Sequence, residues 1–93
     1  MINIKHTETE RNGLFEAWLD DVQVGELTYQ RTTLERMIID HTRVFEGYEG
    51  QGIARQLLMA AVDFARQQGR TIVPVCSYAR KVLMRTDEYI DIL

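Results

Sequence analysis

The stretch EGYEGQGIARQLLMAAVDFARQQG, residues 46–69, decides the fold. From residue 53 to residue 68 its apolar side chains recur at helical spacing. Eight of them share one half of a helical wheel: Ile53, Ala54, Leu57, Leu58, Ala61, Val62, Phe64 and Ala65. Gly69 follows where a left-handed C-cap is expected. The pattern therefore predicts an amphipathic helix over 53–68 that packs its apolar face on a sheet.

The glycine-rich loop before this helix is a candidate anion site. Glycines at a strand-to-helix turn let backbone N–H groups point at a ligand, and the positive end of the helix dipole attracts phosphate. The alternative interpretation of an isolated Gly-x-Gly is a tight turn that uses glycine only for its dihedral angles. A Walker loop would need Gly-Lys-Ser/Thr where Gly52-Ile53-Ala54 stands, and a dinucleotide fingerprint would need glycine in place of Arg55.

The residues before the loop have the alternation of strands. Ile2 to Lys5 alternates apolar and polar side chains, and Leu14–Leu19 and Val22–Tyr29 flank Asp20-Asp21 as the arms of a hairpin. Strict alternation breaks at Gly25, which predicts a bulge of one extra residue.

A central strand is predicted over Glu35–Val44. Strict alternation places Met37, Ile39 and His41 on one of its faces, and Ile38, Asp40, Thr42 and Val44 on the other. Both faces are partly apolar, as expected of a strand with neighbours on both sides.

After the helix, Thr71–Cys76 forms an almost unbroken apolar run, which predicts a strand covered on both faces and parallel to the strand before the helix. Pro74 has no N–H to donate, so it needs an edge or irregular position, and the two strands are expected to part near it. Ser77 is the expected N-cap of a last helix that ends near Arg85.

Together these elements predict an α+β fold: a mixed, mostly antiparallel sheet with a strand-helix-strand crossover and a short C-terminal helix. At 93 residues, 45% hydrophobic and 27% charged, the chain has the composition of one compact domain spanning 1–93. No apolar run approaches the roughly 20 residues of a membrane helix, and no secretion signal is visible, so we expect a cytoplasmic protein with no membrane partner. One cysteine excludes an internal disulfide, and the two histidines have no metal-site spacing, so no metal is expected.

The charge is divided unevenly along the chain. Residues 1–50 hold 5 basic and 10 acidic side chains, whereas residues 51–93 hold 6 and 4. The net charge of −3 argues against nucleic-acid binding. An anionic ligand is expected to prefer the second half.

Three motifs in this order resemble the GCN5-related N-acetyltransferases, whose pyrophosphate loop reads Arg/Gln-x-x-Gly-x-Gly/Ala. Glu49-Gly50-Gln51-Gly52-Ile53-Ala54 matches the fourth and sixth positions of that loop. Asp40-His41-Thr42 and Pro74-Val75-Cys76-Ser77-Tyr78-Ala79 resemble a small branch of the same family with Asp/Glu-His-Thr and Pro-x-Cys-x-Tyr/Phe-Ala. Glu49 departs from the Arg/Gln of the loop pattern, and we expect its carboxylate to face solvent, away from the ligand's phosphates.

The resemblance implies an acetyl-coenzyme A site between the parted strands. The strand end would pair with the pantetheine arm through Thr42, Arg43 and Val44, and the pyrophosphate would be held by Gly50, Gln51, Gly52, Ile53, Ala54 and Arg55. On the last helix the implied cofactor contacts are Ser77, Tyr78 and Lys81, with Arg80 and Arg85 as further candidates for the adenosine end. A solvated helix face is the alternative for each basic residue, and core packing is the alternative for Tyr78.

Cys76 and His41 are the candidate catalytic residues. Cys76 ends a strand just before a helix, where the helix dipole stabilises a thiolate, and it would act as acetyl-accepting nucleophile or as the acid that protonates departing coenzyme A. His41 would act as the base, a role for which histidine side chains are suited in general. A small buried hydrophobe and a hydrogen-bonded core histidine are the respective alternatives.

The implied function is transfer of an acetyl group from acetyl-coenzyme A to an amine, by a monomer or weak dimer. The acceptor would be a small molecule, a peptide or a protein. The alternative from another class is a module of the same fold that binds or senses acyl-coenzyme A without turnover, and a weaker one is a general nucleotide-binding protein.

Overall fold

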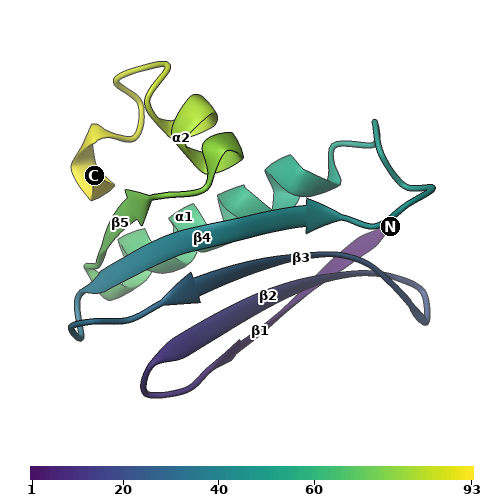
Figure 1. The fold of residues 1–93 in the computed structure, drawn as a ribbon, viewed down its shortest axis with the longest axis horizontal. Coiled ribbons are helices and arrows are strands. Elements are labelled where there is room, and N and C mark those ends of the chain that lie inside the picture. The colour runs from purple at the N-terminus through teal and green to yellow at the C-terminus, as the bar shows by residue number, and fades with distance from the viewer.

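The chain forms one five-stranded sheet with helix α1 lying across one of its faces (Figure 1). The computed structural model describes residues 1–93 throughout. Its elements are β1 (Ile2–Glu8), β2 (Asn12–Leu19), β3 (Val22–Gln30), β4 (Arg36–Val44), α1 (Ile53–Gln68), β5 (Thr71–Pro74), α2 (Ser77–Leu83) and the 3-10 turn η1 (Ile90–Ile92). The strands lie side by side in chain order, antiparallel except for the parallel pair β4–β5. This confirms the predicted α+β fold.

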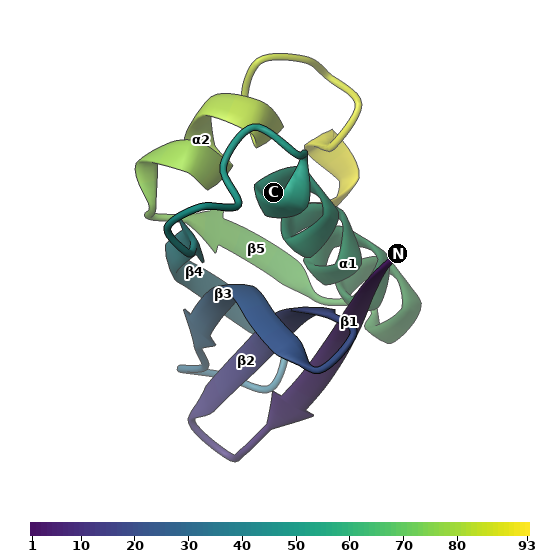
Figure 2. The same cartoon turned by 90° about the vertical axis from the view of Figure 1, so that its right-hand side faces the viewer.

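Helix α1 begins and ends at the predicted residues. Its buried side chains are six of the eight assigned to the apolar half of the wheel: Ile53, Leu57, Leu58, Ala61, Val62 and Ala65. Gly69 ends the helix with φ 66° and ψ 34°, the left-handed cap that the sequence indicated. Figure 2 shows α1 on one side of the sheet, with no helix over the other side of β1, β2 and β3. We call this uncovered side the outer face.

Two bulges interrupt the sheet. One inserts Val24 into β3 opposite the Ala17/Trp18 step of β2, which confirms the irregularity predicted next to Gly25. The other inserts Asp40 into β4, because Thr28 pairs with His41 whereas Tyr29 pairs with Ile39.

The second bulge reverses the faces of β4. Met37 and Ile39 lie in the core, but beyond Asp40 it is Thr42, opposite buried Leu27, that faces inward. His41 is exposed on the outer face, so the prediction that it shares a face with Met37 and Ile39 is wrong. The physical cause is the Asp40 carboxylate, which accepts hydrogen bonds from Thr28 Oγ1 (2.7 Å) and Gln30 Nε2 (2.9 Å) of β3.

Strand β5 is a short edge strand. It ends at Pro74, two residues earlier than predicted, and its pairing with β4 stops there at Ile39. Beyond it, the backbone N–H groups of Val75 and Cys76 both donate to the carbonyl of Ile39, at 3.0 Å each. Val73 and Val75 are 37% and 53% exposed, so the prediction of a strand covered on both faces is wrong.

Candidate functional site

The departure of β5 at Pro74 leaves half of β4 with a free edge. Residues 40–44 have no strand on the β5 side, while their other edge pairs with β3. A free strand edge presents unpaired N–H and C=O groups to an extended ligand. Thr42, Arg43 and Val44 lie on this edge, as predicted. We call the gap between residues 40–44 and the chain after Pro74 the fork.

The glycine-rich loop joins this free edge to the N-terminus of α1. Gly52 is the N-cap with φ 76°, no side chain caps the helix, and its first turn carries no acidic residue. Gly50 has φ 78°, and a Cβ on either glycine would meet no atom within 4 Å. Glycine is thus needed here for its backbone angle, and the space above the loop is open. The first N–H groups of Ile53, Ala54 and Arg55 are therefore available to an anion.

Glu49 is exposed, as predicted, and its carboxylate makes a hydrogen bond within the loop. Its Oε1 accepts the backbone N–H of Gly47 at 2.9 Å. One amide of the loop is thereby already held by a negative group of the chain itself.

Cys76 caps helix α2. Its Sγ accepts the N–H of Ala79 at 3.3 Å and lies 3.4 Å from Oγ1 of Thr42 on β4. Ser77, the predicted cap, is instead the first residue of the helix. Cys76 takes the cap position because its sulfur, one residue before Ser77, is the atom that accepts the free N–H of Ala79. The half-buried thiol thus faces two groups able to donate to a thiolate, one from each side of the fork.

Tyr78 lies near both Cys76 and Arg55, which is in the first turn of α1. Burial raises the pKa of Tyr78, the nearby Cys76 thiol adds to the rise, and the Arg55 guanidinium opposes it. These influences place one half-buried phenol within electrostatic reach of both the thiol and the first turn of α1. Ser77, Arg80 and Lys81 are exposed on α2. Arg85 is also exposed but lies beyond the helix, which ends at Leu83, two residues before the predicted end.

The structure therefore brings Thr42, Cys76, Tyr78 and the glycine loop to the fork, but not His41. The side chain of Arg43 also points away, since it pairs with Glu26 at 3.7 Å and lies over the ring of Phe45. At Arg43 only the backbone is available to a ligand in the fork. The contact between Thr42 and the thiol was not foreseen, because strict alternation put Thr42 on the other face.

No group of three or more His, Cys, Asp or Glu side chains is arranged to hold a metal ion. Neither helix has the length and apolar character needed to cross a bilayer.

Comparison with known proteins links this geometry to one family. A family model described as GCN5-related N-acetyl-transferase matches residues 14–92. The solution structure of a GCN5-like protein from Staphylococcus aureus is similar over 99% of this chain and 89% of its own, with 32% identity and a TM-score of 0.70. No curated protein sequence matches the chain.

Two larger proteins share the fold at lower identity. A ribosomal-protein-alanine N-acetyltransferase from Brucella melitensis is 23% identical with a TM-score of 0.66, over 83% of this chain and 62% of that protein. A GNAT family acetyltransferase from Elizabethkingia anophelis, solved with acetyl-CoA bound, is 17% identical with a TM-score of 0.68, over 90% of this chain and 72% of that one.

Proposed function

The chain belongs to the GCN5-related N-acetyltransferase family, and from this membership we propose that it transfers an acetyl group from acetyl-coenzyme A to an amine at the fork. The observation that carries the proposal is the joining of three features at one place: the free edge of β4, the uncapped start of α1 and the thiol of Cys76.

Each part of acetyl-coenzyme A has a matching part of the chain. The pantetheine arm is an extended chain of amides, which suits the free edge at residues 42–44. The pyrophosphate suits the loop at Gly50–Gly52 and the first turn of α1, where Arg55 adds positive charge. Lys81 on the exposed face of α2 is the candidate for the phosphate of the adenosine end. The basic side chains assigned to the cofactor's phosphates, Arg55 and Lys81, both belong to the more basic half of the chain.

The bound cofactor supplies a thioester, whose acetyl carbon accepts a nucleophile. In the covalent route Cys76 Sγ, as thiolate, bonds to that carbon, the bond from carbon to the coenzyme sulfur breaks, and the coenzyme sulfur takes the proton that Cys76 released. The acceptor nitrogen then bonds to the acetyl carbon, the bond to Sγ breaks, and the nitrogen's proton passes to sulfur. Ala79 N–H and Thr42 O–H stabilise the thiolate in both steps.

In the direct route Cys76 acts as an acid. The acceptor nitrogen bonds to the acetyl carbon, the bond from that carbon to the coenzyme sulfur breaks, and the thiol proton moves to the departing coenzyme sulfur. The proton that the nitrogen loses then restores the Cys76 thiol. Thr42 can accept from the thiol in this state, because either atom of the pair can be the donor. Neither route uses His41 as a partner of Cys76, since the His41 side chain lies on the outer face, away from the thiol.

A ligand competition followed by thermal shift tests the cofactor assignment. Coenzyme A is expected to raise the melting temperature more than equal concentrations of ATP or NAD, because only coenzyme A has the pantetheine arm that fits the free edge. Equal shifts from all three ligands would mean that the loop reads phosphates alone, and no shift from coenzyme A would contradict the proposed function.

Changing Glu49 is expected to strengthen coenzyme A binding. The carboxylate holds the Gly47 amide and repels phosphate, so Glu49→Gln is expected to tighten the Kd about threefold and Glu49→Arg about tenfold. Titration calorimetry at two salt concentrations measures both. Glu46→Gln is the matched control, since Glu46 is an exposed acid of the same loop with no such hydrogen bond. Weaker binding by Glu49→Gln would contradict this role.

A further inference from the structure

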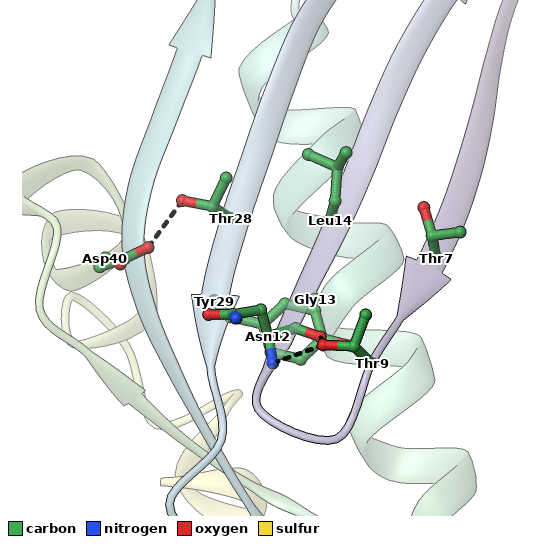
Figure 3. A pocket seen from close by; sticks show the side chains of 8 residues that line it. All are labelled: Thr7, Thr9, Asn12, Gly13, Leu14, Thr28, Tyr29 and Asp40. Carbon is green, nitrogen blue, oxygen red and sulfur yellow. Dashed lines mark hydrogen bonds between the residues drawn. The ribbon is translucent and has the colours of Figure 1, made fainter.

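The outer face of the sheet carries a hollow of about 400 Å³ that the cofactor assignment leaves unused. Figure 3 shows it running across β1 to β4, with Thr7 at one end, Leu14 and Thr28 in the middle and Asp40 at the other end. Its volume falls in the lower part of the range of roughly 300–1,000 Å³ for small-molecule sites. Gly13 also lies in the lining, and the ring of buried Tyr29 fills the space that a side chain on Gly13 would occupy.

Asp40 is the charged group of this hollow. Its two oxygens each accept one hydrogen bond from β3, at 2.7 and 2.9 Å, which fixes the carboxylate but does not neutralise it. None of the four salt bridges of the chain includes Asp40. Each carboxylate oxygen has a second lone pair free to accept from a ligand. The hollow therefore offers a fixed negative charge that lacks a cation.

The hollow and the fork share one residue of β4, Asp40. Asp40 directly follows Ile39, whose carbonyl holds the amides of Val75 and Cys76. The bulge turns the Asp40 side chain to the outer face while Thr42 faces the thiol. A ligand seated on Asp40 is thus next to the strand that carries the free edge, on the side that α1 does not cover.

We propose that this hollow is the acceptor site, and that it takes a primary amine on an unbranched aliphatic stem with its ammonium group at Asp40. The proposal rests on the acetyl-transfer function and adds the acceptor's chemical class. Leu14, Gly13 and the methyl groups of Thr7 and Thr28 provide a surface suited to methylene groups. No basic side chain lines the hollow, and residues 1–50 are strongly acidic, so an amine that also carries a free carboxylate is disfavoured.

An NMR titration of the ¹⁵N-labelled chain with butylamine, without coenzyme A, tests the site by itself. Saturable shifts are expected at the amides of Thr7, Leu14, Thr28 and Asp40, with a Kd on the order of 1–10 mM. Butanol and butyrate serve as the neutral and anionic probes, and neither is expected to give this pattern. Shifts elsewhere, or none that saturate up to about 100 mM, would overturn the proposal.

Two variants separate binding from folding. Asp40→Asn removes the charge, while its amide oxygen can still accept from Gln30 and its NH2 group can donate to the Thr28 hydroxyl. This variant is expected to weaken butylamine binding at least tenfold. Leu14→Lys places an ammonium inside the hollow and is expected to block butylamine while leaving Asp40 intact. Glu16→Gln removes an outer-face carboxylate that does not line the hollow, and is expected to bind butylamine as the native chain does. Native-like butylamine affinity in both Asp40→Asn and Leu14→Lys would overturn the proposal.

Steady-state kinetics tie the site to the reaction. Asp40→Asn is expected to raise the KM for butylamine about tenfold while leaving the Kd of coenzyme A unchanged. If coenzyme A fails to bind while the NMR pattern appears, the proposed function fails and the amine site stands. If acetyl transfer occurs but Asp40→Asn leaves the KM unchanged, the acceptor proposal fails and the transferase function stands.

Discussion

Replacing Cys76 by alanine is expected to lower the rate of acetyl transfer by about 10²–10⁴-fold, whether the thiol acts as nucleophile or as acid. Coenzyme A binding is expected to stay within about threefold of the native chain, because the free edge and the glycine loop are backbone features. The helix cap is lost with the thiol, at a cost of about 1 kcal/mol in stability. Cys76→Ser is the matched control, since its hydroxyl can still accept the N–H of Ala79.

Intact-protein mass spectrometry after incubation with acetyl-coenzyme A separates the roles of Cys76. A hydroxylamine-labile acetyl group that is present in the native chain and absent in both variants identifies an acetyl-cysteine. Loss of activity without such a label points to the acid route. Full activity in Cys76→Ala would contradict both roles, and binding without turnover in the native chain would leave a module that binds acyl-coenzyme A.

Glu8→Gln is expected to lower the free energy of unfolding by about 3 kcal/mol. This is the largest loss of stability that we expect from replacing one charged side chain by a neutral one of similar size. Glu8 on β1 receives Arg31 Nη1 at 3.1 Å, Arg70 Nη2 at 3.1 Å and the hydroxyl of Tyr29 at 2.6 Å. The two arginine side chains are only 11% and 12% exposed. Glutamine would leave these two guanidinium groups close together with no anion. Glu10→Gln, an exposed neighbour, is the control.

The contribution of Glu8 to the free energy of unfolding is expected to depend on pH. Hydrogen bonding by Arg70 is the largest influence lowering the pKa of Glu8, from 4.5 to about 2, although burial opposes it. A depressed carboxylate pKa stabilises the fold above the unfolded value, so this contribution is complete above about pH 4.5 and disappears as the pH falls towards 2. Urea unfolding of the native chain and Glu8→Gln is therefore expected to converge in that window. A difference that persists at pH 2 would contradict the assignment.

His6 makes the comparison between variants necessary. Its Nε2 lies 2.7 Å from the hydroxyl of Tyr29, and its pKa is lowered chiefly by burial. A histidine held neutral in the fold also costs stability once the pH falls below its ordinary value. The native curve alone therefore mixes two groups, and its difference from Glu8→Gln reports Glu8 together with the electrostatic effect of Glu8 on His6.

Local pattern was sufficient to predict most of the elements. The helix over 53–68, its glycine cap, the glycine loop and the parting of the strands at Pro74 each depend on nearby residues, and all four are confirmed. Local pattern could not predict the contacts of Glu8 with Tyr29, Arg31 and Arg70. Glu8 and Arg70 are 62 residues apart, and only the folded sheet brings them together.

The candidate site was predicted less completely, and the reason is one inserted residue. Side chains alternate along a strand with a period of two, so the bulge at Asp40 exchanges the faces of every residue after it. It moved His41 away from Cys76 and brought Thr42 to the thiol. The cause is a pair of hydrogen bonds from Thr28 and Gln30, which the spacing of apolar residues in β4 does not reveal.

The sheet's strand order also has a consequence for how the chain folds. The first four strands are joined by connections of 3, 2 and 5 residues, so each pairing closes a short loop at little entropic cost. Only β5 is connected to its neighbouring strand through a whole helix, and β5 is the shortest strand of the sheet. Local pairings of this kind lower the contact order, which speeds folding, and the β4 edge belongs to the part of the chain that pairs locally. The free edge of β4 is complete without β5, whose early end keeps it open.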